Sequence, residues 1–147
     1  MFKKIMDNYF KKYSFDRDML ASVAFYTDDS IIITDNKMDE PGPYIVYVNP
    51  AFTRMTGYQP EDVLGKNPRL LQGPKTNIEE LKRLRETLEK GEVFYGQSVN
   101  YRKDGSEFIN EWHIESIYNS EGHVTHYLAV QHDVTERVKA QEAMSKR

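Results

Sequence analysis

The sequence contains no cysteine, and this absence excludes several classes of protein at once. Disulfide frameworks, thiolate metal sites and thiol catalysis all need that side chain. Histidine is also scarce, with 4 residues among 147 and no HxH or HxxxH pair, which argues against a zinc enzyme. No apolar run approaches the roughly 18 residues that a membrane-spanning helix needs. We therefore expect a cytoplasmic protein without a membrane span.

The sequence also lacks a surplus of basic residues. Its net charge is −3 at pH 7, whereas proteins that bind the phosphate backbone usually carry a basic excess. We therefore expect no nucleic-acid partner. The amino-terminal stretch MFKKIMDNYFKKYSF has charges spread through it, so it does not read as a secretory signal. At 147 residues the chain is long enough for one domain with a hydrophobic core.

The first 20 residues have the pattern of an amphipathic helix. Such a helix could lie on a membrane surface, or it could pack on the domain or on a second copy of the chain. We favour packing, and we expect residues 1–23 to form a helix that flanks the core. The apolar positions recur at spacings of three and four, with lysines between them: Phe2, Ile5, Met6, Tyr9, Phe10 and Tyr13.

The rest of the chain predicts two strands, several short helices, a longer helix and three further strands. Asn49 is an N-cap for a short helix, and Thr76 and Glu79 form a capping box for the longer one. The buried stripe of the longer helix is expected to be Leu81, Leu84 and Leu88. Strands are expected at residues 30–34, 44–48, 94–102, 107–118 and 124–133. This order predicts an α+β fold, with a five-stranded antiparallel sheet and short helices on one of its faces.

Three of the predicted strands each place one carboxamide on a largely apolar face. Because side chains alternate along a strand, we expect Asn100, Asn110 and Gln131 to point to the same side of the sheet. A buried amide without partners costs about 1–3 kcal/mol, so these three are expected to face one another, water or a ligand. Amides both donate and accept, which suits a heterocycle edge such as that of an isoalloxazine or a pterin. The sequence therefore predicts a cavity with an apolar floor and a polar wall.

The segment GKNPRLLQGPKTN, residues 65–77, offers groups for the other end of such a ligand. Arg69 can form paired hydrogen bonds with a phosphate, and Arg85 on the following helix can converge with it. Asn67 and Gln72 can hydrogen-bond a polyol chain. These residues predict a phosphate and polyol site beside the amides.

The sequence resembles the PAS domain superfamily, and within it the light-oxygen-voltage (LOV) group of flavin-binding domains. The resemblance runs from about Ala24 to Thr135. It implies a PAS fold, with residues 24–134 as the sensory core and residues 135–147 as a C-terminal helix or linker. It also implies FMN as the cofactor, with FAD as the alternative. The motifs that carry it are, in order, IIITD, YVNPAFTRMTGY, EDVLGKNPRLLQGPKTN, NYRKDGSEFIN and YLAVQHDVTER.

The resemblance also implies roles for individual residues. Asn67 and Gln72 would contact the ribityl chain of the flavin, and Arg69 and Arg85 would hold its phosphate. The residues that it implies at the edge of the flavin ring are Asn100, Asn110 and Gln131. Those that it implies as the lining of the ring pocket are Ile32, Thr34, Trp112 and Ile114.

Pro68 is the main departure from the LOV pattern, because it stands where that group has its photoactive cysteine. The flavin–thiol bond of the group is therefore impossible in this chain. We expect instead that flavin binds without a covalent bond and is photoreduced by a nearby Trp112 or tyrosine. Protonation at the flavin N5 would then be read by Gln131. Chemical reduction reaches the same state, so the input is either light or redox potential.

The sequence leaves an alternative function open. N-P-R-L-L-Q also occurs in PAS domains not known for flavin, so the alternative is a flavin-free dimerisation or small-ligand module of a bacterial-type signalling protein. Catalysis is not expected, because Glu111, His113 and Glu115 alternate onto the face opposite the amides. We expect a homodimer through the sheet face and the terminal helices, and the sequence identifies no downstream effector. The apolar residues on that outer face are Ile109, Ile117 and Val130.

Overall fold

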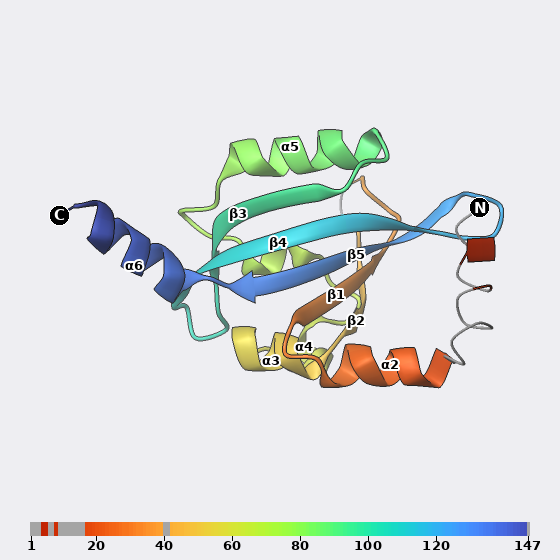
Figure 1. Cartoon of the computed structure of the whole chain (residues 1–147), viewed down its shortest axis with the longest axis horizontal. Coiled ribbons are helices and arrows are strands. Elements are labelled where there is room, and N and C mark those ends of the chain that lie inside the picture. Colours follow the sequence, from red (N-terminus) through yellow and green to blue (C-terminus); the bar gives the residue numbers. More distant parts are fainter. Residues whose placement is uncertain (1–3, 6–7, 9–16, 40–41, 147) are drawn as a thin grey trace.

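The computed structural model of the chain describes all residues except 1–3, 6–7, 9–16, 40–41 and 147. An antiparallel sheet of five strands forms its centre (Figure 1). The strands are β1 (Ser30–Asp35), β2 (Ile45–Val48), β3 (Phe94–Tyr101), β4 (Glu107–Tyr118) and β5 (Val124–Asp133). The helices are α2 (Arg17–Tyr26), α3 (Pro50–Thr56), α4 (Pro60–Val63), the 3₁₀ helix η1 (Pro68–Leu71), α5 (Ile78–Glu89) and α6 (Thr135–Ser145). This is the α+β architecture that the sequence predicts.

The strand order in the sheet is β2-β1-β5-β4-β3. The last strand of the chain, β5, therefore lies at the centre, between β1 and β4 (Figure 1). Gln131 on β5 is in register with Ser30 on β1 and with Trp112 on β4. The order brings the first and last strands together, so side chains more than a hundred positions apart in the sequence meet on one face of the sheet.

Asn49 holds together the turn before β1, the start of α3 and the end of α2. Its side-chain oxygen accepts from the backbone N–H groups of Phe52 (3.1 Å) and Ile31 (2.9 Å). Its side-chain nitrogen donates to the carbonyl oxygens of Ala24 (2.9 Å) and Asp29 (2.8 Å). The residue is thus more than the N-cap that the sequence predicts, because it also fixes β1 against two helices.

The start of α5 differs from the prediction. Its N-cap is Asn77, whose side chain accepts from the Glu80 N–H. The Thr76 hydroxyl instead accepts from the Gly73 N–H at 2.8 Å and so closes the turn that precedes the helix. The predicted capping box of Thr76 and Glu79 is therefore wrong, because the Thr76 hydroxyl forms its hydrogen bond within the preceding turn and not with the helix.

The main apolar core lies between β1, β2 and the short helices. Of the stripe predicted on α5, Leu88 is buried, and Leu81, Leu84 and Leu88 all line a cavity. Because the three leucines line it, α5 forms one wall of the cavity as well as covering β3. The buried core residues are Ile32, Ile45, Val48, Phe52, Val63 and Leu71.

Helices also flank the sheet at both ends of the described chain. Most of the helix predicted over residues 1–20 lies outside the described residues, and α2 continues past residue 20 to Tyr26. At the other end α6 begins at Thr135, directly after β5, and points away from the sheet (Figure 1).

Asp133 fixes the joint between β5 and α6. Its carboxylate accepts from the Thr135 N–H (3.0 Å) and hydroxyl (2.6 Å), and it forms an ion pair with Arg102 (2.6 Å). Burial disfavours the charged carboxylate, but the hydrogen bonds from Thr135 and the charge of Arg102 outweigh burial and lower the pKa of Asp133. The Thr135 hydroxyl also accepts from the Ile109 N–H (2.8 Å), so the start of α6 is tied to β4 as well.

Candidate ligand-binding site

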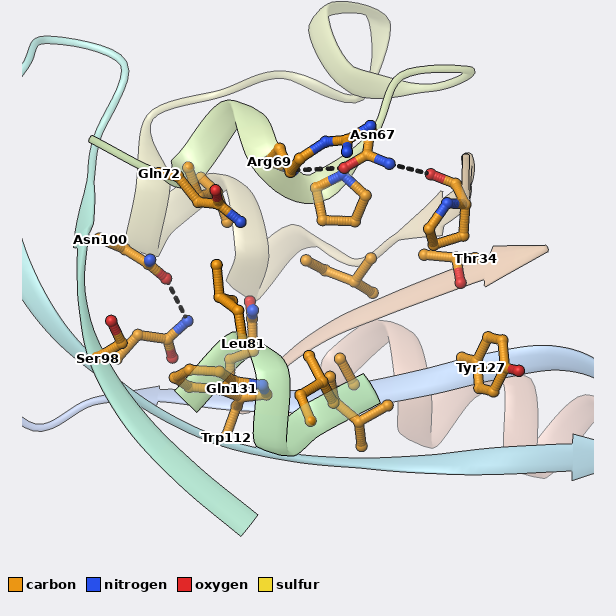
Figure 2. A pocket seen from close by; sticks show the side chains of 18 of the residues that line it. Thr34, Asn67, Arg69, Gln72, Leu81, Ser98, Asn100, Trp112, Tyr127 and Gln131 are labelled. Carbon is orange, nitrogen blue, oxygen red and sulfur yellow. Dashed lines mark hydrogen bonds between the residues drawn. The ribbon is translucent and has the colours of Figure 1, made fainter. Parts of the chain in front are cut away.

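A cavity of about 400 Å³ lies between the sheet, η1 and α5. This volume is within the range of roughly 300–1,000 Å³ that is typical of small-molecule sites. Figure 2 shows Gln72, Ser98, Asn100, Trp112 and Gln131 around the same space, although they come from separate elements. All the residues predicted to bind the cofactor line this cavity: Ile32, Thr34, Asn67, Arg69, Gln72, Arg85, Asn100, Asn110, Trp112, Ile114 and Gln131. The structure brings these residues together, and their role in binding stays a prediction.

The walls of the cavity are largely apolar. Ile32 on β1 and Trp112 and Ile114 on β4 contribute from the sheet, and Leu81 and Leu84 contribute from α5. The alternation expected for β4 places these two of its side chains on the cavity side. A flat aromatic ligand would bury apolar surface between the sheet and the helix, at about 25 cal/mol for each Å² removed from water.

Asn100 and Asn110 form a pair in the wall of the cavity. The Asn110 side-chain nitrogen donates to the Asn100 side-chain oxygen at 2.8 Å. Asn110 is only 1% exposed, and among the described residues no hydrogen-bond donor reaches its Oδ1 atom. A buried acceptor without a donor costs about 1–3 kcal/mol. The wall of the cavity therefore contains a buried hydrogen-bond acceptor that lacks a donor.

Gln131 provides a second polar group, on the neighbouring strand. Its Oε1 accepts from the hydroxyl of Ser30 at 3.2 Å, and both side chains are buried. Ser30 can donate to the amide oxygen or accept from the amide nitrogen, so it can support the amide in either orientation. No sequence signal pointed to Ser30, because its contact with Gln131 depends on the pairing of β1 with β5.

Asn67 shapes the backbone that borders the cavity. Its side-chain oxygen accepts from the Arg69 N–H at 2.8 Å and caps η1, and its nitrogen donates to the Pro43 carbonyl at 2.9 Å. Pro68 occupies the first position of η1, where proline fits because its missing N–H is not needed there. Asn67 therefore joins the β1–β2 connection to η1, a role that the sequence did not reveal.

The two arginines predicted to bind phosphate lie at the exposed rim of the cavity. Arg85 forms ion pairs with Asp39 (2.8 Å) and Glu89 (3.2 Å), and hydrogen bonds to Glu89 and Asp39 raise its pKa. Asp39 lies in the connection between β1 and β2, so its pair with Arg85 crosses the rim of the cavity. An anionic ligand group at Arg85 would compete with Asp39 for the same guanidinium.

A PAS domain profile matches residues 28–136 of the chain. The chain belongs to the PAS domain family. The blue-light-activated histidine kinase of Rhizobium johnstonii is 34% identical, over 93% of this PAS protein and 40% of the relative. The chain spans between 12% and 46% of the length of the first four curated relatives.

Solved structures place this PAS domain near the LOV group. An RNA-binding light-oxygen-voltage receptor superposes with a TM-score of 0.79 and 36% identity, over 88% of this chain and 36% of that one. A light-oxygen-voltage domain studied with a flavin analogue superposes with a TM-score of 0.73 and 33% identity, over 90% of this chain and 98% of that one. The likeness thus covers the whole of a LOV domain, as the sequence motifs indicated.

In the part of the chain that the structure describes, no helix is both long and apolar enough to cross a membrane. No three histidine, aspartate or glutamate side chains in the same part are grouped to hold a metal ion.

Proposed function

We propose that this chain is a sensory module that binds a flavin, FMN rather than FAD, without a covalent bond. The observation that carries the proposal is the unsatisfied Oδ1 of Asn110, buried in the wall of a cavity lined by the residues that the LOV resemblance singled out. The edge of a flavin ring carries an N–H between two carbonyl groups. The N–H matches the acceptor on Asn110, and the carbonyls match the amide donors of Asn100 and Gln131.

The other end of the cavity suits the remainder of FMN. Gln72 lies beside the path of a polyol chain, and Arg69 and Arg85 lie at the rim, where a phosphate would reach solvent. Binding of the phosphate would replace the Asp39 carboxylate on Arg85, an exchange of one anion for another. The exposed Arg85–Asp39 pair contributes little to stability, so its loss costs little.

A bound flavin supplies absorption of blue light and a ring nitrogen, N5, that takes up a proton on reduction. Gln131 is the side chain that we propose to read this change, because its amide offers an oxygen or a nitrogen to the ring. Ser30 supports either orientation, as its hydroxyl both donates and accepts. Gln131 stands two positions before Asp133 on β5. Rotation of its amide would therefore alter the end of β5, where Asp133 holds the start of α6.

The proposed module has three parts along the chain. Residues 24–134 are the sensory core, and residues 1–23 and 135–147 are flanking segments that pass the signal to a partner or effector. No turnover is attributed to the module itself. Some relatives are named as histidine kinases, and the chain spans 40% of the one from Rhizobium johnstonii.

The test is an absorption spectrum of the purified protein after incubation with excess FMN or FAD and removal of the free flavin. We expect a yellow protein with the blue absorption band of flavin, whose intensity changes on illumination or on chemical reduction. A colourless protein after both incubations overturns the proposal and supports the flavin-free PAS module.

Gln131→Leu is a sharper probe of the same site. The substitution removes one hydrogen bond to the ring edge but keeps a side chain of similar volume, so flavin should stay bound while its absorption and emission bands shift. Gln97→Leu on the exposed outer side of β3 is the matched control and should leave the bands in place. Unchanged bands in the Gln131 variant would mean that this amide does not contact the ring.

A further inference from the structure

Trp112 is the one tryptophan in the sequence, and it lies in the wall of the cavity beside Gln131. The two residues are partners in the β4–β5 register, so their Cα atoms are neighbours across the sheet. Figure 2 shows both side chains at the same end of the cavity, with Tyr127 at the opposite end. Trp112 is 7% exposed, so its indole lies almost entirely out of water.

The packing around Trp112 holds the indole in one place. Its ring lies 5.7 Å from that of Phe94, with an angle of 47° between the ring planes. Gly96 is in register with Trp112, and a Cβ atom at Gly96 would meet Phe94 Cζ at 2.4 Å. The Arg83 guanidinium covers the Phe94 ring at 4.4 Å, which fixes that ring in turn. The indole is therefore held against a fixed aromatic neighbour and cannot easily move out of the cavity.

Indole and phenol are the most easily oxidised aromatic side chains, and Trp112 and Tyr127 are the residues that bring them to this cavity. Tyr127 is four positions from Gln131 along β5, or about 13 Å at roughly 3.3 Å per residue. Electron transfer weakens steeply with distance. We therefore expect a flavin ring edge held at Gln131 to receive an electron from Trp112 and not from Tyr127.

We propose that Trp112 is the electron donor that quenches the excited flavin in this cavity, an inference that rests on the proposed function. On illumination the indole gives up one electron to the ring and is oxidised, while the ring is reduced by the same electron. Phe94, the aromatic side chain against the indole, is much harder to oxidise, so the positive charge stays on Trp112. The electron then returns to the indole. No bond forms or breaks, and no external oxidant or reductant is consumed.

The return of the electron to Trp112 makes light and a chemical reductant different inputs. While the electron resides on the ring, N5 can take up a proton and Gln131 can respond. The return of the electron to Trp112 ends that state. Trp112 therefore shortens the response to light, whereas a chemical reductant produces a state that the indole cannot reverse.

The experiment compares the flavin-loaded wild-type protein with Trp112→Phe and Tyr127→Phe. Equal flavin content is first established from the absorption spectra, and emission yield and lifetime of the bound flavin are then measured. We expect Trp112→Phe to raise both severalfold, because phenylalanine keeps the aromatic packing and removes the donor. Tyr127→Phe is expected to change them little. Transient absorption of the wild-type protein is an independent readout, in which an oxidised indole should appear as the emission decays.

The possible failures are distinguishable. Bound flavin with the same emission in wild type and Trp112→Phe overturns the role of Trp112 and leaves the proposed function intact. An increase in Tyr127→Phe alone, or a tyrosyl instead of an indole signal in the transient spectra, also overturns it. Absence of bound flavin from the wild-type protein overturns both proposals.

Discussion

At the scale of single residues, Asn110 links the stability of the protein to its affinity for a ligand. Replacing Asn110 by Leu removes the unsatisfied Oδ1 but deprives Asn100 of its donor, two effects of opposite sign on stability. We expect the free energy of unfolding of the ligand-free protein to change by less than about 1 kcal/mol. Affinity for FMN should fall about tenfold or more, because one buried hydrogen bond is worth about 1.4 kcal/mol or more here.

Urea denaturation and a flavin titration measure the two quantities. Asn36→Leu serves as the control, because that exposed amide donates to the Val124 carbonyl outside the cavity. A loss of stability of about 3 kcal/mol together with unchanged affinity would show instead that Asn110 is a structural residue.

Replacing Pro68 tests how close a bound flavin lies to η1. It lines the cavity at the first position of η1, between Asn67 and Arg69. Pro68→Cys places a thiol at that position and leaves the Asn67 cap in place. We expect illumination to bleach the blue absorption band of the bound flavin, with recovery in the dark. Pro68→Ser has a side chain close in size to cysteine but no thiol, so its flavin band should not bleach. A Pro68→Cys variant whose flavin band does not bleach would place the flavin away from η1.

At the scale of elements, Asn49 is the joint between α2, β1 and α3. Asn49→Ala leaves four backbone groups without the partner that they have now, and these groups are partly or fully buried. We expect a loss of about 3 kcal/mol in the free energy of unfolding, measured by urea denaturation. Asn77→Ala removes a single exposed cap of α5 and should cost only about 1 kcal/mol. Equal losses of unfolding free energy in the two variants would contradict the role of Asn49 as a joint.

The extent to which the sequence predicts these elements depends on how local their signals are. The strands 107–118 and 124–133 were predicted with the bounds that the structure has, because alternation and the turn residues between them are local. Alternation also placed Asn100, Asn110 and Gln131 on one face. The sequence could not reveal Ser30 against Gln131 or Asp39 on Arg85, because these contacts depend on strand order and on side chains 101 and 46 positions apart. The start of α5 was misplaced because Thr76 and Asn77 are both good caps.

At the scale of the whole molecule, the outer face of the sheet decides whether two copies associate. Side chains that alternate away from the cavity include Ile109, Ile117 and Val130, all half-buried. Val130 is in register with Ile31 on one side and His113 on the other, so it lies in the middle of that face. On β4, Glu111 and Glu115 lie between Ile109 and Ile117, so the apolar centre of the face is formed by Val130 and Leu128 on β5 with Ile31 and Ile33 on β1. An apolar centre with charged side chains beside it suits an interface between copies.

We therefore predict a homodimer that dissociates when Val130 is replaced by Glu, because the interface would bury an unpaired carboxylate. Sedimentation at several protein concentrations measures the change, and flavin content should be unaffected because Val130 points away from the cavity. Gln97→Glu adds the same charge at an exposed position of the edge strand β3 and should remain dimeric. A wild-type protein that stays monomeric at high concentration would refute the dimer. A Val130→Glu protein that stays dimeric would place the contact on the terminal helices, where α2 exposes Val23 and Phe25.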